Sequence, residues 1–266
     1  RAATARLLAA HGVRPRRELG QHFLADPNLV RKIVVAGEIW PGDRVLEIGA
    51  GAGTLTRALA AIGARVLAYE VDTRLRPVLE EVLQGVDGVE VRYADAANID
   101  PAELAGEEWV VVANLPYHVG TPLLLRLLRE APTISRFVVM LQREAVERLA
   151  ASPGSRIYGL PSVVVQLHGT IKVAFRVHPG VFIPEPKVES AVAVIHRRAA
   201  HPLAERAVAL AAAAFGHRRK MLRRSLASVV ADPGAVLAAA GLDPTRRAED
   251  LSPGDYLRLA EVAGEG

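Results

Sequence analysis

Absent residue types already narrow the classes of protein to which this chain can belong. The sequence contains no cysteine, which excludes disulfide bonds and cysteine-ligated zinc or iron–sulfur centres and fits a reducing compartment. No stretch approaches the roughly 18 apolar residues of a membrane-spanning helix, and the alanine-rich run 207–215 reads as a short buried helix. No signal peptide is visible, and the start at Arg1 leaves open whether residues precede it. We therefore expect a cytoplasmic protein that does not contact a membrane.

Positive charge in this chain is clustered, although the formal net charge of the 266 residues is only +4. A basic arm near the start carries Arg14, Arg16 and Arg17. A basic cluster at 217–224 carries Arg218, Arg219, Lys220, Arg223 and Arg224. Such clusters suit a polyanion such as RNA, but they are also typical of an ordinary solvated helix face, and charge alone does not decide between the two.

Residues 44–142 alternate between two patterns. Short runs rich in β-branched residues, typical of strands buried on both faces, occupy 44–49, 65–72, 89–95, 109–114 and 136–142. Apolar residues at helical spacing occupy 54–63, 73–85 and 121–130. Thr54 and Thr121 stand where helix N-caps are expected. The alternation predicts an α/β fold with a parallel sheet between two layers of helices.

The pattern changes after residue 144. Two further strands are expected at 162–177 and 190–198, joined by a proline-rich irregular segment. From residue 201 onward the chain has a helical pattern, broken at Pro233-Gly234 and Asp243-Pro244. We expect a first domain over 1–198 that contains the sheet and a small all-helical domain over 199–266.

A glycine loop, "EIGAGAG" at 47–53, follows the first strand and opens the first helix. Gly49 and Gly51 would let a ligand touch the backbone. Glu70, 21 residues after Gly49, is placed to accept the hydroxyls of a ribose, and Asp95 is placed to accept from an adenine amino group. A tight strand–helix turn and a dinucleotide dehydrogenase are the alternatives. The G-x-G-x-G spacing and the lack of a basic residue in the loop favour a nucleoside cofactor without phosphates, such as S-adenosylmethionine.

The fourth strand ends in "NLPY" at 114–117. The exocyclic nitrogen of adenine is a poor nucleophile, and two acceptors on its hydrogens favour the tetrahedral geometry that it needs to attack a methyl group. The Asn114 side chain and the Leu115 carbonyl, directed by Pro116, are the candidate acceptors. Tyr117 offers a flat face for the base. The alternative is a proline turn with a core tyrosine, which the neighbouring glycine loop and acids make less favourable.

Taken together, these residues resemble the KsgA/RsmA family of rRNA adenine-N6,N6-dimethyltransferases. The resemblance spans nearly the whole chain and includes "LGQHFL" (19–24), "EIGAGAGTLT" (47–56), "NLPY" (114–117), "VFIPEPKVESAV" (181–192) and "RRKMLRRSL" (218–226). It implies a Rossmann-like class I methyltransferase sheet. It also implies transfer of methyl groups from S-adenosylmethionine to two adjacent adenosines near the 3′ end of 16S rRNA, with a role in small-subunit biogenesis.

The resemblance also assigns roles to residues. It implies that His22 and Leu24 touch the cofactor, with Gly49, Gly51, Glu70, Asp95 and Asn114, and that Phe182 stacks on the target adenine opposite Tyr117. Many relatives carry asparagine where this chain has His22, and a structural histidine is the alternative. Ala50 replaces a proline that is common in the family, which affects the stiffness of the loop more than its chemistry.

The remaining expectations concern the partner of the protein and two alternative functions. The expected partner is small-subunit rRNA or the 30S particle, bound by a monomer that needs no metal. One alternative is a methyltransferase of the antibiotic-resistance type that modifies 23S rRNA. The other is a mainly non-catalytic assembly factor for the small subunit.

Overall fold

The computed structural model describes residues 1–116, 119–217 and 219–264, and the chain divides into two compact units. The first contains residues 1–146 and 172–196, and the second contains 147–171 and 197–266. This division differs from the boundary at 198/199 expected from the sequence. The difference arises because helix α7 (Leu160–His168) packs against α8 (Ala204–Gly216) and thereby joins the C-terminal helices.

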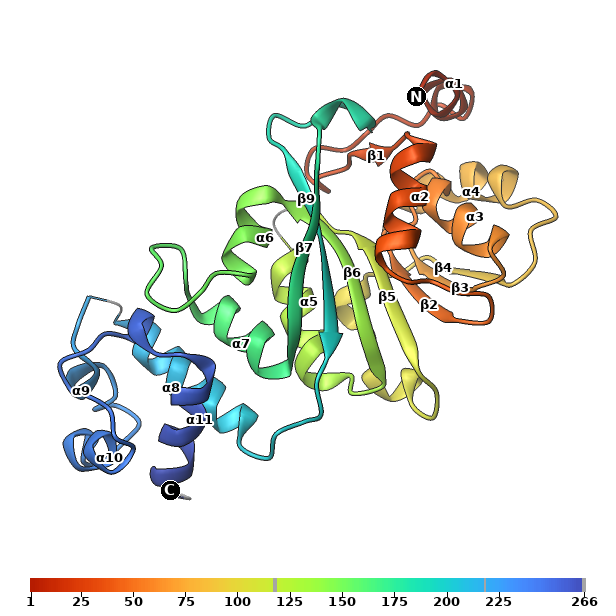
Figure 1. Ribbon diagram of the computed structural model, residues 1–266. Coiled ribbons are helices and arrows are strands. Elements are labelled where there is room, and N and C mark those ends of the chain that lie inside the picture. The colour runs from red at the N-terminus through yellow and green to blue at the C-terminus, as the bar shows by residue number, and fades with distance from the viewer. Residues whose placement is uncertain (117–118, 218, 265–266) are drawn as a thin grey trace. The chain divides into compact units, whose positions relative to one another are not determined.

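A sheet of seven strands organises the first unit (Figure 1), in the order β4-β3-β2-β5-β6-β9-β7. The strands are β2 (Arg44–Ile48), β3 (Arg65–Tyr69), β4 (Val89–Arg92), β5 (Trp109–Asn114), β6 (Ile134–Gln142), β7 (Gly169–Val177) and β9 (Ser190–Arg197). The strands from β4 to β6 are parallel, and β9 runs antiparallel to β6. The predicted α/β class and its parallel strands are confirmed.

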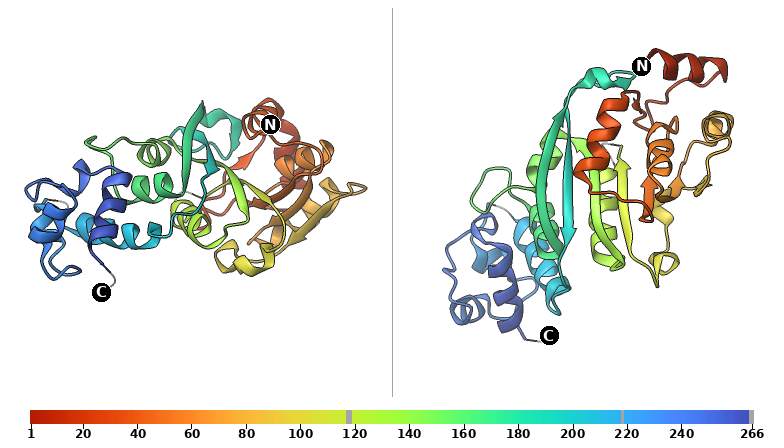
Figure 2. Two further views of the ribbon diagram at one scale, coloured as in Figure 1. Left: turned by 60° about the horizontal axis from the view of Figure 1, so that its bottom comes forward. Right: turned by 45° about the vertical axis from the view of Figure 1, so that its right-hand side comes forward.

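Three helices connect parallel strands: α3 (Thr54–Ala61) joins β2 to β3, α4 (Arg76–Val82) joins β3 to β4, and α5 (Gly120–Glu130) joins β5 to β6. α2 (Pro27–Ala36) precedes β2, and α6 (Arg143–Leu149) follows β6. The chain steps from β2 to β4 in one direction and from β5 to β6 in the other, so right-handed crossovers place α3 and α4 on one face and α5 on the opposite face. The right-hand view of Figure 2 shows α2 and α3 beside one face of the sheet. The strand order therefore reverses between β2 and β5, where ligands of open α/β sheets bind.

A two-stranded antiparallel sheet adds to the first unit. It pairs β1 (Phe23–Leu24) with β8 (Phe182–Ile183), so the early "LGQHFL" segment meets the late proline-rich segment. Helix α1 (Ala2–Ala10) precedes this sheet, and short 3₁₀ helices occupy 73–75, 96–98, 101–104, 179–181 and 248–250.

Two helices begin elsewhere than the sequence predicts. Gly53, with φ of 76°, precedes α3, and Thr54 is the first helical residue and not a side-chain cap. α5 begins at Gly120, so Thr121 lies inside the helix. A Cβ on Gly120 would lie 2.6 Å from the Leu141 side chain and 2.7 Å from that of Leu115. Gly120 therefore packs too closely on Leu115 and on Leu141 of β6 for a larger residue, and both predicted threonine caps are wrong.

The expected strand over 162–177 is wrong in its first part. Residues 160–168 form α7, and only 169–177 form the strand β7. Val163, Val164 and Val165 favour a strand by propensity, but all three are buried in a helix that packs against α8 and α11. Tertiary packing has overridden the local preference.

The second unit is helical over its described C-terminal part, as expected after residue 201. It contains α7, α8, α9 (Leu222–Ser225), α10 (Pro233–Ala239) and α11 (Pro253–Val262). Pro233 starts α10 and does not merely break a helix. The Phe215 ring lies 6.0 Å from that of Tyr158 and 6.4 Å from that of Tyr256. Both buried tyrosine hydroxyls donate to backbone carbonyls, which lets the unit bury them.

Candidate active site

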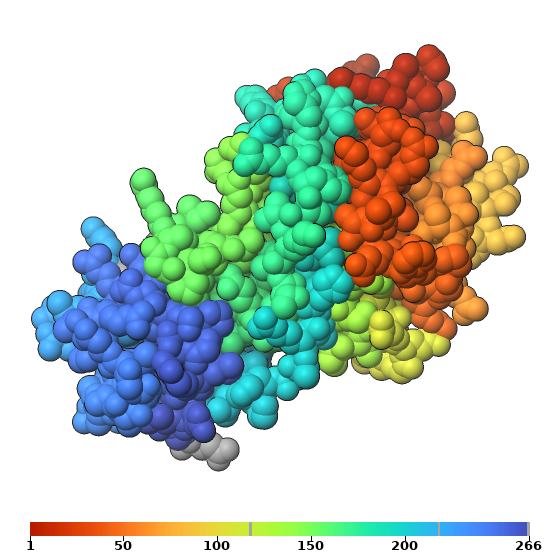
Figure 3. All heavy atoms as spheres, viewed as in Figure 1, coloured from red at the N-terminus to blue at the C-terminus, as the bar shows by residue number. Residues whose placement is uncertain are grey.

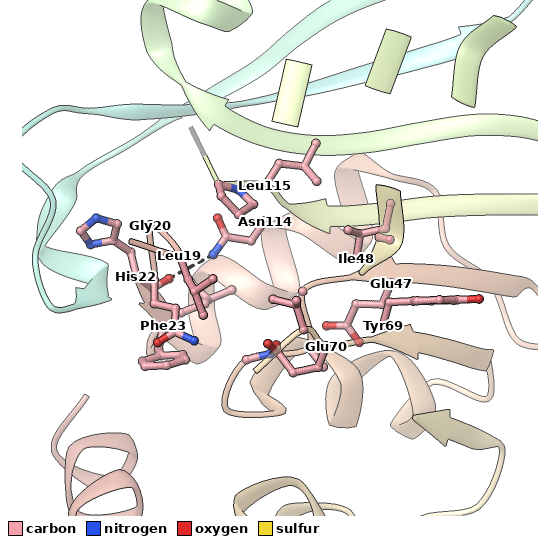
Figure 4. A pocket seen from close by; sticks show the side chains of 18 of the residues that line it. Leu19, Gly20, His22, Phe23, Glu47, Ile48, Tyr69, Glu70, Asn114 and Leu115 are labelled. Carbon is pink, nitrogen blue, oxygen red and sulfur yellow. Dashed lines mark hydrogen bonds between the residues drawn. The ribbon is translucent and has the colours of Figure 1, made fainter. Parts of the chain in front are cut away.

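A pocket lies at the carboxyl ends of β2, β3 and β5, at the reversal of strand order (Figure 4). Its lining includes ten of the predicted site residues: His22, Leu24, Gly49, Gly51, Glu70, Asp95, Asn114, Leu115, Pro116 and Phe182. The fold thus gathers residues that are up to 160 positions apart in the sequence (22 to 182). Tyr117, which the sequence also assigns to the site, lies outside the described residues.

The glycine loop forms one wall of the pocket. Gly49 and Gly51 have φ angles of 84° and 57°, a region that glycine adopts without strain. The backbone amides of Gly49 and Ala50 both donate to the Tyr69 carbonyl, at 2.9 and 3.1 Å. A Cβ on Gly51 would lie 3.2 Å from the Phe23 ring. The loop therefore presents bare backbone where a side chain would fill the pocket.

Glu70 follows directly after β3 and is only 5% exposed. Its two carboxylate oxygens accept from the backbone amides of Gly51 and Asp72, both at 2.8 Å. Burial raises the pKa of Glu70, and these two hydrogen bonds act in the opposite direction. Each carboxylate oxygen has two lone pairs, so the group can hold the glycine loop and still accept from a ligand. The sequence predicts the second task but not the first.

Asp95 lies at the exposed rim of the pocket, three residues beyond the end of β4. Its Oδ1 accepts from the Ala97 amide at 2.8 Å and caps a short 3₁₀ helix. This bond fixes the position of the carboxylate before any ligand binds.

Asn114 is the last residue of β5, and its Nδ2 donates to the His22 carbonyl at 3.1 Å (Figure 4). Because the amide nitrogen is used in this bond, the side-chain oxygen remains as the acceptor on the other branch. The Leu115 amide donates to the Met140 carbonyl at 3.1 Å, and the Pro116 carbonyl accepts from Gly120 at 2.9 Å. The backbone after Asn114 is thus held on both sides.

The His22 ring makes its hydrogen bond to Pro184 and not to Asn114. Its Nδ1 lies 2.7 Å from the Pro184 carbonyl and must donate, since a carbonyl can only accept. Figure 4 shows the ring directed away from Glu70. The backbone of His22 reaches Asn114, while the predicted contact of His22 with the cofactor stays a prediction.

Phe182 belongs to both the core and the pocket. It is 1% exposed, lies opposite Leu24 in the β1–β8 pair, and packs within the main apolar cluster. It also lines the same pocket as Asn114. A core role and a stacking role for Phe182 therefore both have a physical basis.

Glu47 is a pocket residue that sequence reasoning missed. It is 1% exposed, and among the described residues neither of its carboxyl oxygens has a hydrogen-bond partner. Burial raises the pKa of Glu47 to about 8; the nearby Thr56 hydroxyl acts in the opposite direction, and the Glu70 carboxylate adds to the rise. The raised pKa favours the protonated form of Glu47 near neutral pH. Its signal in the sequence was the single acidic residue in the apolar strand 44–48.

The predicted RNA-binding residues lie outside the pocket lining. Arg219 and Lys220 occupy the turn after α8, whereas Arg223 and Arg224 belong to the four-residue helix α9. The cluster is therefore not one continuous helical stretch, as the sequence suggested, because α8 ends at Gly216. These four residues are exposed, as are Arg14, Arg16 and Arg17 of the basic arm. Arg218 lies outside the described residues.

Two features that would point to other kinds of function are absent from the described residues. In the part of the chain that the structure describes, no group of three or more His, Asp or Glu side chains could hold a metal ion. Over the same residues, no helix combines the length and apolar character needed to cross a membrane.

Comparison with known proteins decides the family. The model of the ribosomal RNA adenine dimethylase family matches residues 12–265. The chain belongs to this family. Two proteins named ribosomal RNA small subunit methyltransferase A are similar to this chain: the one from Rhodospirillum rubrum is 47% identical to it, and the one from Phenylobacterium zucineum is 44% identical. Each alignment covers 96% of this chain and 90% of the relative.

Solved structures agree with this membership. A dimethyladenosine transferase from Plasmodium falciparum shares the fold with a TM-score of 0.77 and 24% identity, over 90% of this chain and 96% of that one. The 23S rRNA methyltransferase ErmE has a TM-score of 0.70 and 29% identity, over 91% of this chain and all of its own. The predicted class I methyltransferase fold and the predicted family are confirmed. The protein is an rRNA adenine dimethyltransferase, and S-adenosylmethionine is the cofactor of its family.

The pocket fits this cofactor. The bare backbone at Gly51 leaves room that a side chain would occupy, and the buried carboxylate of Glu70 can accept from hydroxyl groups. Among the described residues that line the pocket none is lysine or arginine, which matches a nucleoside without phosphates. The chemistry of the lining and the family therefore point to the same ligand.

Proposed function

We propose that the protein methylates N6 of two adjacent adenosines near the 3′ end of 16S rRNA in the small ribosomal subunit, and that it takes part in biogenesis of that subunit. The observation that carries the proposal is one pocket that contains the glycine loop, Glu70 and Asn114. The 44–47% identity to proteins named for the small subunit, against 29% to ErmE, favours 16S over 23S rRNA as the substrate.

We infer that the backbone of Gly49 and Gly51, the Glu70 carboxylate and the Asp95 carboxylate hold the cofactor, with His22 and Leu24 beside it. Glu70 accepts from the ribose hydroxyls, and Asp95 accepts from the adenine amino group. When bound, S-adenosylmethionine supplies an electrophilic methyl group on a sulfonium. The raised pKa of Glu47 favours its uncharged form near neutral pH, which limits the negative charge beside Glu70.

The chain itself prepares the nucleophile. The Asn114 side-chain oxygen and the Leu115 carbonyl accept the two hydrogens of the target N6, which favours the tetrahedral nitrogen that attack requires. The bond from Asn114 to the His22 carbonyl orients the amide for this task. Tyr117 and Phe182 stack on the unpaired base. Positioning and preorganised acceptors suffice, and no general base is needed, because the extra proton on N6 passes to water after the transfer.

RNA contact is assigned to the two basic regions. We propose that Arg14, Arg16 and Arg17 of the arm, and Arg218, Arg219, Lys220, Arg223 and Arg224 of the cluster, bind phosphates of the small-subunit rRNA. We further propose that the protein acts as a monomer in the cytoplasm, where small subunits are assembled.

The test uses small subunits that lack the modification, large subunits and naked 16S rRNA, each with methyl-labelled S-adenosylmethionine. Label in two adjacent adenosines of small-subunit rRNA is the expected result. Label in 23S rRNA would contradict the proposal and favour the resistance-type activity. Binding to small subunits without methyl transfer would instead favour a non-catalytic assembly factor.

A further inference from the structure

The segment from the basic arm to the pocket is fastened by hydrogen bonds that the proposed reaction does not use. The Gln21 side-chain oxygen accepts from the backbone amide of Arg16 at 2.8 Å, and the backbone amide of Gln21 donates to the Arg16 carbonyl at 3.2 Å. Gln21 therefore closes a loop over 16–21 that carries two arginines of the arm. Its Nε2 donates to Asp72 Oδ2 at 2.8 Å.

Asp72 is the anchor of this loop. It is only 3% exposed, and its carboxylate also accepts from Nε and Nη2 of Arg74, at 2.9 and 2.6 Å. Nη1 of the same guanidinium donates to the Arg14 carbonyl at 3.4 Å. Two side chains, Gln21 and Arg74, thus tie the backbone of the arm to one buried carboxylate.

The anchor leads directly to the proposed ribose acceptor. The Asp72 amide donates to Glu70 Oε1 at 2.8 Å, and the other oxygen of Glu70 holds the glycine loop. Residues 19–24, which follow the arm, line the pocket themselves. A nucleoside in the pocket would therefore touch both ends of the connection, the segment after the arm and Glu70.

We propose that Gln21 and Asp72 are positioning residues that couple occupancy of the cofactor site to order in the basic arm. The inference rests on the proposed function, in that it takes Glu70 and the 19–24 segment as cofactor contacts. Release of the arm would remove the Gln21 donor from a buried carboxylate, which is costly, and a bound cofactor adds contacts that exist only when 19–24 is in place. The enzyme then presents an ordered arm to RNA when it is loaded with cofactor.

Such coupling must be reciprocal. If the cofactor favours the fastened arm, the fastened arm favours the cofactor by the same factor. Arg16 and Arg17 in the loop are exposed. Helix α1, which precedes them, lies at the surface of its unit (dark red in Figure 3). The bonds after Arg16 and Arg17 therefore provide trypsin sites that report on the state of the arm.

The experiment measures trypsin cleavage after Arg16 and Arg17 by mass spectrometry, with and without S-adenosylhomocysteine, which cannot transfer a methyl group. In the wild-type protein the ligand should slow cleavage by roughly 5–150-fold, the usual range of a coupling between sites. Gln21→Glu keeps an acceptor for the Arg16 amide but sets a second carboxylate against Asp72, so the ligand should no longer protect. Gln84→Glu, at a glutamine of the same unit that lies outside the pocket lining, is the matched control and should keep the protection.

The outcomes separate the coupling from the proposed site. Calorimetric binding of S-adenosylhomocysteine without protection of the wild-type arm would overturn the coupling and leave the cofactor site intact. Equal protection in wild type and Gln21→Glu would also overturn it. No calorimetric binding to the wild type would overturn the proposed function and the coupling with it. If Gln21→Glu melts early, Gln21→Met, which keeps the volume but removes both the donor to Asp72 and the acceptor of the Arg16 amide, must show the same failure of protection.

Discussion

The proposed cofactor pocket and the basic cluster of the second unit are built in opposite ways. In the pocket, Glu70 is buried and each of its oxygens has a backbone donor at 2.8 Å. In the cluster, Arg219, Lys220, Arg223 and Arg224 are all exposed. Buried, hydrogen-bonded groups act at short range and resist salt, whereas exposed charges act at long range and are screened. We therefore expect the pocket to set the rate and the affinity for the cofactor, and the cluster to set the affinity for RNA.

The largest effect is expected at Asn114, the proposed acceptor for the target N6. Asn114→Ala removes one preorganised acceptor and should lower the single-turnover rate of methylation by about 10²–10³, with little change in RNA affinity. Asn28→Ala, at an exposed asparagine, is the control. A rate for Asn114→Ala within a few-fold of wild type would show that the proposed acceptor is not used.

The next effect concerns Glu70. Glu70→Ala should weaken cofactor binding by about 1.5–3 kcal/mol, the range for a charged hydrogen bond, when measured by calorimetry. It should also lower the melting temperature, because the amides of Gly51 and Asp72 would be left without their acceptor. Glu70→Gln keeps one acceptor oxygen and should be less destabilised. Unchanged cofactor affinity in a folded Glu70→Ala protein would contradict the assignment.

Phe182 refines the contrast within the pocket, because its core and stacking roles respond differently to leucine. Phe182→Leu keeps apolar volume, so it should cost less than about 1.5 kcal/mol in the free energy of unfolding. Removal of the aromatic face should weaken binding of the target base by about 1–3 kcal/mol and reduce methylation accordingly. Cofactor affinity should not change. Full activity on small subunits would leave Phe182 with only its core role.

Glu47 makes the free energy of unfolding of the protein depend on pH. Its pKa rises from 4.5 to about 8 in the folded protein, so between these values the folded state holds a proton that the unfolded state has released. The stabilising contribution is complete below pH 4.5 and falls as pH rises toward 8, by about 1.4 kcal/mol per unit within that window.

Urea unfolding at pH 6 and pH 7 tests this dependence. Glu47→Gln should lack it, so the stability of wild type relative to this variant should fall between the two pH values. Glu144→Gln, at a glutamate outside the pocket lining, should track the wild type. A wild-type and Glu47→Gln difference that is constant with pH would show that Glu47 is ionised in the folded protein.

The smallest effect belongs to the basic cluster and appears only in the salt dependence. Replacing Arg219 and Lys220 with glutamine should flatten the plot of log affinity for RNA against log salt by roughly 0.7–0.9 for each phosphate that is no longer neutralised. The single-turnover rate of methylation of RNA that is already bound should stay the same. An unaltered slope would show that Arg219 and Lys220 do not contact phosphates of the RNA and are ordinary solvated surface residues.

Most of the fold, and the meeting of ten predicted residues in one pocket, could be predicted from the sequence where the signal is local. Buried strands show β-branched runs, and Gly49, Glu70 and Asn114 each stand at or beside a strand end, so their convergence followed from the parallel sheet. The prediction failed for 162–168, because packing against α8 and α11 outweighs a strand-like run of valines. Gln21 was also missed, because its role depends on Asp72, a partner 51 residues away that no local pattern indicates.

The proposed outcome of catalysis in this pocket is the placement of two methyl groups on N6 of each target adenosine. Mass spectrometry of the nucleosides released from small-subunit rRNA after reaction with the enzyme tests this outcome. We expect N6,N6-dimethyladenosine at both adjacent positions. A product methylated on a ring nitrogen, or one that stops at a single methyl group per adenosine, would contradict the proposed arrangement of Asn114 and Leu115 around N6.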